Sequence, residues 1–179
     1  MAITATDILF KFSVKTGTAG NSTAGTADGS LGKYISTTQI TDATLNNLFD
    51  DVTGDENAAS DVEYRCIFIH NAHATLTWQS VVAWLSAEVA GGANAAIAID
   101  GVAASAIGAT AAQADEVANE GTAPTGEAFS SPTTKATGLS IGNLSAGNCR
   151  AIWVRRSATN SAALDNDGVT VRAEGDTAA

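Results

Sequence analysis

The sequence has few of the residues that mark disulfide-stabilised, membrane-spanning or nucleic-acid-binding proteins. Its 179 residues include two cysteines, two prolines and nine lysines and arginines, and aromatic residues make up 6%. Two cysteines are too few for a disulfide scaffold. No run approaches the roughly 18 apolar residues of a membrane helix, and the start lacks a secretory signal. We therefore expect a soluble, unprocessed chain without a membrane partner, in which Cys66 and Cys149, both in apolar alternating runs, are buried reduced thiols.

Positive charge is scarce and unevenly placed. Nineteen acidic residues give a net charge of −10, with a sequence pI of about 4.3, so the chain lacks the basic footprint that binds a polyanion, and nucleic acid is not expected as a partner. Five of the nine cations follow residue 134. An acidic cluster lies earlier in the chain, at Asp50, Asp51, Asp55, Glu56, Asp61 and Glu63. The separation suits contact between oppositely charged patches of neighbouring subunits, but solvated surface charge is the favoured explanation.

Large apolar side chains are also in short supply. Alanine contributes 36 residues, and leucine, isoleucine, valine and phenylalanine together contribute another 36. The latter fraction, about a fifth, is close to the level below which a chain struggles to build a core. The length predicts a single domain over residues 1–179. We expect this domain to gain stability from self-association or from docking on a larger surface.

The first strand and the segment after it are clearly marked. Alternating apolar residues predict a strand over 8–14. Residues 16–33 are rich in glycine, serine and threonine and predict a long flexible loop or arm, which would become ordered against a partner. A short helix is expected after Thr41 or Asp42, with Leu45, Leu48 and Phe49 on one face and an end at Gly54.

The rest of the chain shows further period-two runs separated by glycine-rich turns. They predict strands over 61–71, 77–86, 94–100, 136–141, 149–156 and 168–174. Residues 101–122 have no clear period and are read as a loop with room for a helical turn. Seven or eight short strands and one short helix predict an all-β fold, an antiparallel β-sandwich of immunoglobulin-like or jelly-roll type.

No group of residues forms a convincing catalytic or metal-binding motif. Cys66, His70 and His73 have a spacing that superficially suggests zinc, but no fourth ligand lies close in the sequence, so we interpret the histidines as polar residues at a strand end. Residues 165–168 resemble the start of a calcium loop but fit a turn better. The acidic pair at 115–116 needs no catalytic explanation. With no P-loop, dinucleotide fingerprint or nucleophile elbow in the sequence, we expect no enzyme activity, no cofactor and no metal.

Aromatic and arginine residues point to contacts between proteins. Trp84 and Trp153 lie in apolar strands and are expected in the core, whereas Trp78 is the candidate for a surface aromatic that stacks on a sugar. Arginine on the last strands suits pairing with carboxylates at an interface, or protection of an edge strand. The candidate interface residues are Phe10, Phe12, Tyr34, Arg150, Arg155, Arg156 and Arg172.

Four blocks carry a resemblance to a known group of proteins. They are Leu45-Asn-Asn-Leu-Phe-Asp-Asp-Val52, Glu63-Tyr-Arg-Cys-Ile-Phe-Ile-His-Asn71, Ala123-Pro-Thr-Gly126 and Gly147-Asn-Cys-Arg-Ala-Ile-Trp-Val-Arg-Arg156. In these blocks the chain resembles small virion structural proteins of tailed bacteriophages, most closely capsid decoration (cement) proteins. The four blocks lie between residues 45 and 156, and they carry no catalytic residues.

This resemblance implies a β-sandwich that is made in the cytoplasm of a bacterial host and built into the virion. Such proteins commonly sit as trimers at local threefold positions on the capsid surface, where they clamp neighbouring capsomers. The expected partners are further copies of the chain, as a homotrimer, and the major capsid protein. Two alternatives remain open at this point: a component of the phage tail or neck, and a carbohydrate-binding adsorption module that uses Trp78.

Overall fold

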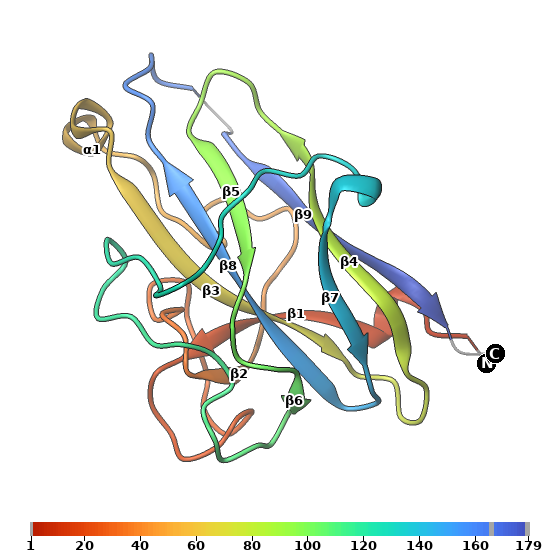
Figure 1. Cartoon of the computed structure of the whole chain (residues 1–179). Coiled ribbons are helices and arrows are strands. Elements are labelled where there is room, and N and C mark those ends of the chain that lie inside the picture. The colour runs from red at the N-terminus through yellow and green to blue at the C-terminus, as the bar shows by residue number, and fades with distance from the viewer. Residues whose placement is uncertain (1, 165–166, 178–179) are drawn as a thin grey trace.

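The protein is an antiparallel β-sandwich, as the sequence predicts. The computed structural model describes residues 2–164 and 167–177. The strands are β1 (Ile8–Val14), β2 (Tyr34–Gln39), β3 (Val62–Asn71), β4 (Trp78–Glu88), β5 (Asn94–Ile99), β6 (Ser105–Ala106), β7 (Leu139–Leu144), β8 (Asn148–Ser157) and β9 (Val169–Thr177). The large sheet has the order β2-β1-β3-β8-β5, with β6 also paired to β8, and the small sheet has the order β7-β4-β9 (Figure 1). No helix in the described part of the chain is both long and apolar enough to cross a membrane.

The two sheets enclose the first of two apolar cores. Alternate residues of β3 and β8, including Ile67, Ile69, Ile152 and Val154, point toward the small sheet. Side chains of β4 and β7 meet them there, and the expected inward face of the last strand, Val169, Val171 and Ala173, packs against the same cluster. The apolar residues of the period-two pattern in these strands are therefore those that face the interior of the sandwich.

A second core lies on the opposite, outer face of the large sheet. It contains Cys66, Phe68, Cys149, Ala151 and Trp153, each of them no more than 1% exposed. The loops that cover this face supply Leu31, Ala114, Val117 and Phe129. The large sheet is thus buried on both faces, which explains why residues 66–69 in the middle of β3 are apolar at every position. Both cysteines are free thiols, and burial raises the pKa of Cys149 to about 12.

Residues 16–33 form part of this covering layer. The segment is irregular, as its composition predicts, but hydrogen bonds tie it to its neighbours, in contrast to the free arm expected from the sequence. The Asn21 amide donates to the Ile35 carbonyl at 2.6 Å, and the Gly20 amide donates to the Ala109 carbonyl at 2.8 Å. The Gly32 amide donates to the Ser13 hydroxyl at 2.9 Å, inside the protein. Main-chain hydrogen bonds thus hold this segment against the rest of the protein, whereas apolar side chains hold the strands.

The predicted helix after Thr41 is wrong. The only α-helix within the described residues is α1 (Gly54–Ala59), one segment later. Ala43 and Asn46 have positive φ angles, which interrupt a right-handed helix, whereas Thr53 and Glu56 form a reciprocal capping box that begins α1. Leu48 still packs on the inter-sheet core, so its apolar spacing reflects an irregular loop.

Smaller differences concern strand limits. Strand β2 is an addition to the predicted set, and within the loop over 101–122 only the two-residue β6 is regular. The strand expected from residue 136 begins at Leu139, because the 3-10 turn η2 (Lys135–Thr137) precedes it; a similar turn, η1 (Ala5–Asp7), precedes β1. The turn expected over 165–168 includes residues that lie outside the described part.

Candidate functional site: an acidic segment and a carboxylate cluster

The arginines of β8 do not form an exposed patch. Arg150 donates through Nη2 to the carbonyl oxygen of Asp100 at 3.0 Å. Arg155 points to the opposite face of the strand, where its guanidinium lies 5.3 Å from the ring centre of Phe129. Both side chains are half-buried and serve contacts within the chain.

Arg156 also works inside the molecule. Its guanidinium contacts the carboxylates of Glu63 and Asp50, the latter at 3.1 Å, and lies 4.9 Å from the ring centre of Phe49. Only 13% of the Arg156 side chain is exposed. Of the four candidate arginines, Arg172 alone is exposed, on β9 above the ring of Trp84. The structure therefore does not bring the four together.

The aromatic candidates are mostly internal as well. Phe10 packs against the inter-sheet core and Phe12 is half-buried. Tyr34 is 7% exposed, and its hydroxyl donates to the carbonyl of Thr110 at 3.0 Å. Trp78 is 5% exposed and belongs to the inter-sheet core, so its interpretation as a surface aromatic is wrong.

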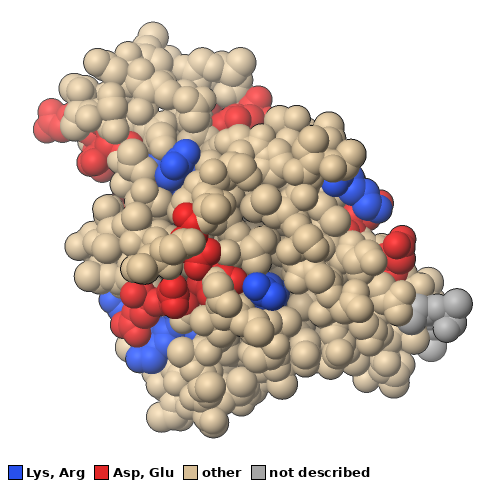
Figure 2. All heavy atoms as spheres, viewed as in Figure 1, with Lys and Arg blue, Asp and Glu red and all other residues tan. Residues whose placement is uncertain are grey.

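Residues 41–61, called the acidic segment from here on, form the most distinctive exposed surface. Its exposed carboxylates are Asp42, Asp50, Asp51, Asp55 and Asp61. Among them Leu45 is 72% exposed, the most exposed large apolar side chain of the described residues. Figure 2 shows acidic side chains at the end of the molecule that carries α1, and a larger acidic group nearer the middle of the same face. The sequence marked this cluster by its charge, and the structure adds the exposed apolar residue.

Contacts beneath the acidic segment hold it in place. The ring of Phe49 contacts two guanidinium groups, with its centre 5.4 Å from that of Arg65 and 4.9 Å from that of Arg156. Arg65 is 1% exposed and forms a salt bridge with Glu120, which brings in the loop after β6. Farther along, the Asn57 side chain exchanges hydrogen bonds with the main chain of Ser161 at 2.7 and 3.2 Å. The segment is therefore a positioned surface.

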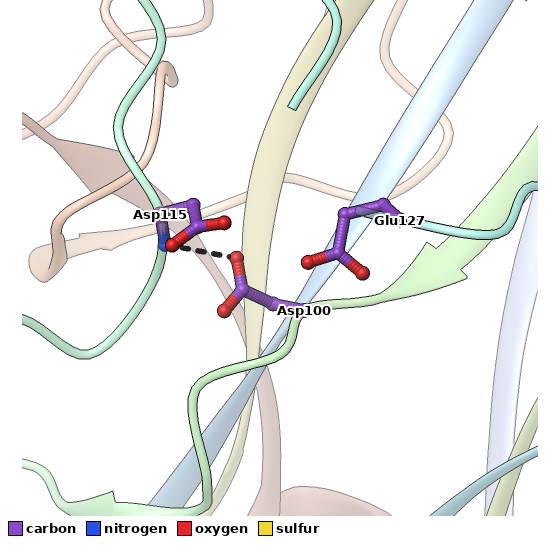
Figure 3. Close-up of side chains that lie close together, drawn as sticks. All are labelled: Asp100, Asp115 and Glu127. Atoms are coloured by element: carbon purple, nitrogen blue, oxygen red, sulfur yellow. Dashed lines mark hydrogen bonds between the residues drawn. The ribbon is translucent and has the colours of Figure 1, made fainter. Parts of the chain in front are cut away.

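A second group of carboxylates lies on the outer face of the large sheet, where the loop after β5 meets the long loop after β6. Asp100, Asp115 and Glu127 each offer an oxygen within 4.8 Å of the others, and Figure 3 shows the three side chains pointing toward one another. Within the described residues this is the one such group of three acidic, histidine or cysteine side chains, so Cys66, His70 and His73 do not form one. Beyond the acidic pair at 115–116, no sequence pattern marks this cluster, because loop packing alone brings its residues together.

This carboxylate cluster has the side chains of a site for a hard cation, and it also has hydrogen bonds that hold loops in place. Oxygen ligands of this kind suit Ca²⁺ or Mg²⁺. However, the buried Asp100 already accepts hydrogen bonds from Trp153 Nε1 at 2.8 Å, from the Asp115 amide at 3.0 Å and from the Val102 amide at 2.8 Å. Glu127 accepts from the Gly101 amide at 2.8 Å. These bonds fasten the loops after β5 to the large sheet.

The environment of Glu127 makes a pH-dependent prediction. Burial raises the pKa of this carboxyl, and Asp100 and Asp115 act in the same direction. Stability should therefore decrease as pH rises from about 4.5 through the raised pKa. Glu127→Gln keeps the acceptor for Gly101 and removes the charge, so we expect a higher melting temperature than wild type at pH 7 and no advantage at pH 4, measured by calorimetry. The exposed Asp51→Asn is the control. If Glu127→Gln were less stable than wild type at both pH values, the proposed repulsion between Glu127 and the two aspartates would be contradicted.

His70 makes the opposite prediction. It is 6% exposed on the outer face of the large sheet, where burial, followed by the charge of Lys11, lowers its pKa to about 4. Between pH 6.5 and pH 4 the His70 side chain is therefore protonated in the unfolded chain but not in the folded chain. The free energy of unfolding decreases as pH falls through this range. Urea titrations should show a loss of about 2 kcal/mol from pH 7 to pH 5. His70→Gln should flatten this slope, and His73→Gln should retain it; equal slopes in wild type and His70→Gln would contradict the assignment.

Comparison with protein-family models, with curated proteins and with solved structures finds no match for this chain.

Proposed function

We propose that the chain is a structural virion protein of a tailed bacteriophage that decorates the capsid and stabilises it across capsomer boundaries. The resemblance of four sequence blocks to such proteins supports this function. The observation that carries it further is the acidic segment, a positioned surface with Leu45 exposed among carboxylates. An apolar side chain ringed by charge is the common composition of a protein-binding patch.

The charge of this surface defines the partner. Three of the four candidate arginines, Arg150, Arg155 and Arg156, are engaged in contacts within the chain, whereas the exposed charges of the acidic segment are negative. The proposed shell contact is therefore a basic, partly apolar patch of the major capsid protein. Assembly as a homotrimer, location on the outer shell, and absence of enzyme activity are parts of this proposal that come from the resemblance and from the sequence.

The decisive experiment locates the protein in a particle. Phage particles from a lysate of the bacterium that carries this sequence would be purified, quantified by mass spectrometry and imaged by cryo-electron microscopy. We expect density for the sandwich at regular positions on the outer shell, with the acidic segment against the shell. Density only at the tail or neck would replace the capsid function with the alternative. Absence of the protein from purified particles would reject a virion function.

A binding assay then tests the surface. Particles stripped of the protein would be mixed with the purified chain and sedimented. Asp51→Lys should weaken binding by about tenfold because it reverses a charge at the contact. Leu45→Asp should have an effect of similar size because it places a charge where an apolar side chain would be buried. Asp176→Lys, an equal charge change on exposed β9, is the matched control and should bind as wild type does. Equal binding by all variants would show that the acidic segment is not the contact.

A further inference from the structure

The sandwich has four sheet edges, and three of them are covered or irregular. The outer edge of β2 is bonded to loop residues, with the Asn21 amide donating to Ile35 and the Thr37 amide donating to Thr23. At the edge of β5, two main-chain hydrogen bonds join Ile97 and Ser130. Strand β7 carries a bulge near Gly142, where φ is +84°. Covers and bulges are the usual means by which proteins keep sheet edges from pairing.

The fourth edge, β9, carries no bulge, and beyond β4 and the ion pair of Glu174 only its last residue is hydrogen-bonded to another described segment, where the Ile3 amide donates to the Thr177 hydroxyl at 3.2 Å. It is the terminal strand of the small sheet, and within the described residues its main chain has no hydrogen-bonded neighbour other than β4. Both irregularities in the β4–β9 pair place the extra residue on β4. Strand β9 itself runs for nine residues without a break in the alternation between half-buried and exposed side chains. It is therefore a regular edge with main-chain donors and acceptors to offer.

We propose that β9 pairs with the β9 of a second copy of this chain, antiparallel and about a twofold axis at Ala173. The pairing would join two small sheets into one continuous six-stranded sheet. The partner is fixed by the charges along the strand: at this register Arg172 lies opposite Glu174 of the second copy, and the reverse pair lies across the axis. The exposed Thr170 and Asp176 stand opposite each other in the same way.

Neighbouring registers are excluded by the same charges. Moving the axis by one residue places Arg172 opposite its own copy, or Glu174 opposite its own copy, and like charges directly opposed destabilise a sheet. Half-step registers would place the inward-facing Val171 beside an outward-facing residue of the second copy, and a twofold axis does not allow this because it relates like faces of the two sheets. Within the subunit Glu174 already pairs with Lys135 at 2.6 Å, and this pair keeps the carboxylate on the exposed face.

This contact is independent of the proposed capsid function. A twofold contact cannot close a trimer, so it forms a dimer in free solution, and on a shell it would link copies that belong to neighbouring trimers. A monomeric chain that still binds particles would reject the β9 contact alone, and a β9 dimer that never enters a particle would reject the capsid function alone.

The test measures the mass of the full chain by light scattering after size exclusion, over a range of concentrations and at low salt. We expect a shift from 18.0 kDa to twice that mass as concentration rises, weakened by added salt. Arg172→Glu and Glu174→Arg each oppose like charges at two symmetric positions and should weaken pairing by about tenfold. The double variant restores opposite charges and should recover the wild-type dimer.

Asp51→Arg, a charge reversal away from the edge, is the matched control and should dimerise as wild type does. Circular dichroism on every variant establishes that the sandwich is folded. A monomer at all concentrations would overturn the proposal and leave Arg172 and Glu174 as residues that protect the edge. A folded double variant that remains as weak as the single variants would overturn the proposed register and the pairing with it.

Discussion

Gly32→Ala should destabilise the protein by at least about 3 kcal/mol, because the new methyl group has nowhere to go. Gly32 has a φ of +97°, and a Cβ built there would overlap the main-chain carbonyl of Asp115. The neighbouring Lys33 amide donates to that same carbonyl at 3.2 Å, and Gly32 bridges to Glu116. A clash with main-chain atoms can be relieved only by separating these two loops. Urea unfolding followed by tryptophan fluorescence measures the loss.

Gly126→Ala is the matched control for this substitution. Its φ of +85° is similar, but a Cβ there meets nothing within 4 Å. The control therefore reports only the cost of a left-handed alanine, about 1 kcal/mol. If Gly32→Ala loses no more than Gly126→Ala, the loops over 16–33 and 101–130 are not packed as described. A larger loss shows that this covering layer is part of the cooperative fold.

The covering layer is also the feature that sequence patterns missed. Alternation located β1, β3, β4, β5, β8 and β9, because each strand has at least one apolar face against a core. Residues 16–33 carry almost no apolar period, and their burial rests on main-chain hydrogen bonds and on small residues such as Ser13 and Ser30, both 0% exposed. Composition cannot distinguish a glycine-rich loop in solvent from one packed on a sheet.

The misplaced helix and the unforeseen carboxylate cluster have different causes. The spacing of Thr53 and Glu56 is visible in the sequence as a capping box, and it marks the start of the helix that forms. The apolar spacing of Leu45 and Leu48 is weaker evidence for a helix, because a loop can also produce it. Asp100 and Glu127, by contrast, are far apart in the sequence and meet only because separate loops cover one face. No local pattern encodes such a meeting. The acidic segment was predictable from the sequence as a run of acidic residues, because a cluster of charge is visible in the sequence without knowledge of tertiary contacts.

Trp153 should be the most sensitive side chain of the outer core. Its ring is 0% exposed, and Nε1 donates to the buried carboxylate of Asp100 at 2.8 Å. Trp153→Ala removes the ring and leaves a cavity, so we expect a loss of about 3–5 kcal/mol in urea unfolding. Trp153→Phe keeps most of the ring and withdraws one donor from a buried carboxylate, which should cost about 1–3 kcal/mol.

A second tryptophan separates these two contributions. Trp84 is 6% exposed, comparable in burial, and packs under Arg172 with no hydrogen bond from its indole in the described residues. Trp84→Phe therefore changes ring size alone. The additional loss in Trp153→Phe is the contribution of the bond to Asp100, and it should become smaller when both variants are compared in an Asp100→Asn background, where the acceptor no longer carries a charge. Equal losses at the two tryptophans in the wild-type background would mean that Asp100 is held by its main-chain donors alone, and that the carboxylate cluster fastens the loops without Trp153.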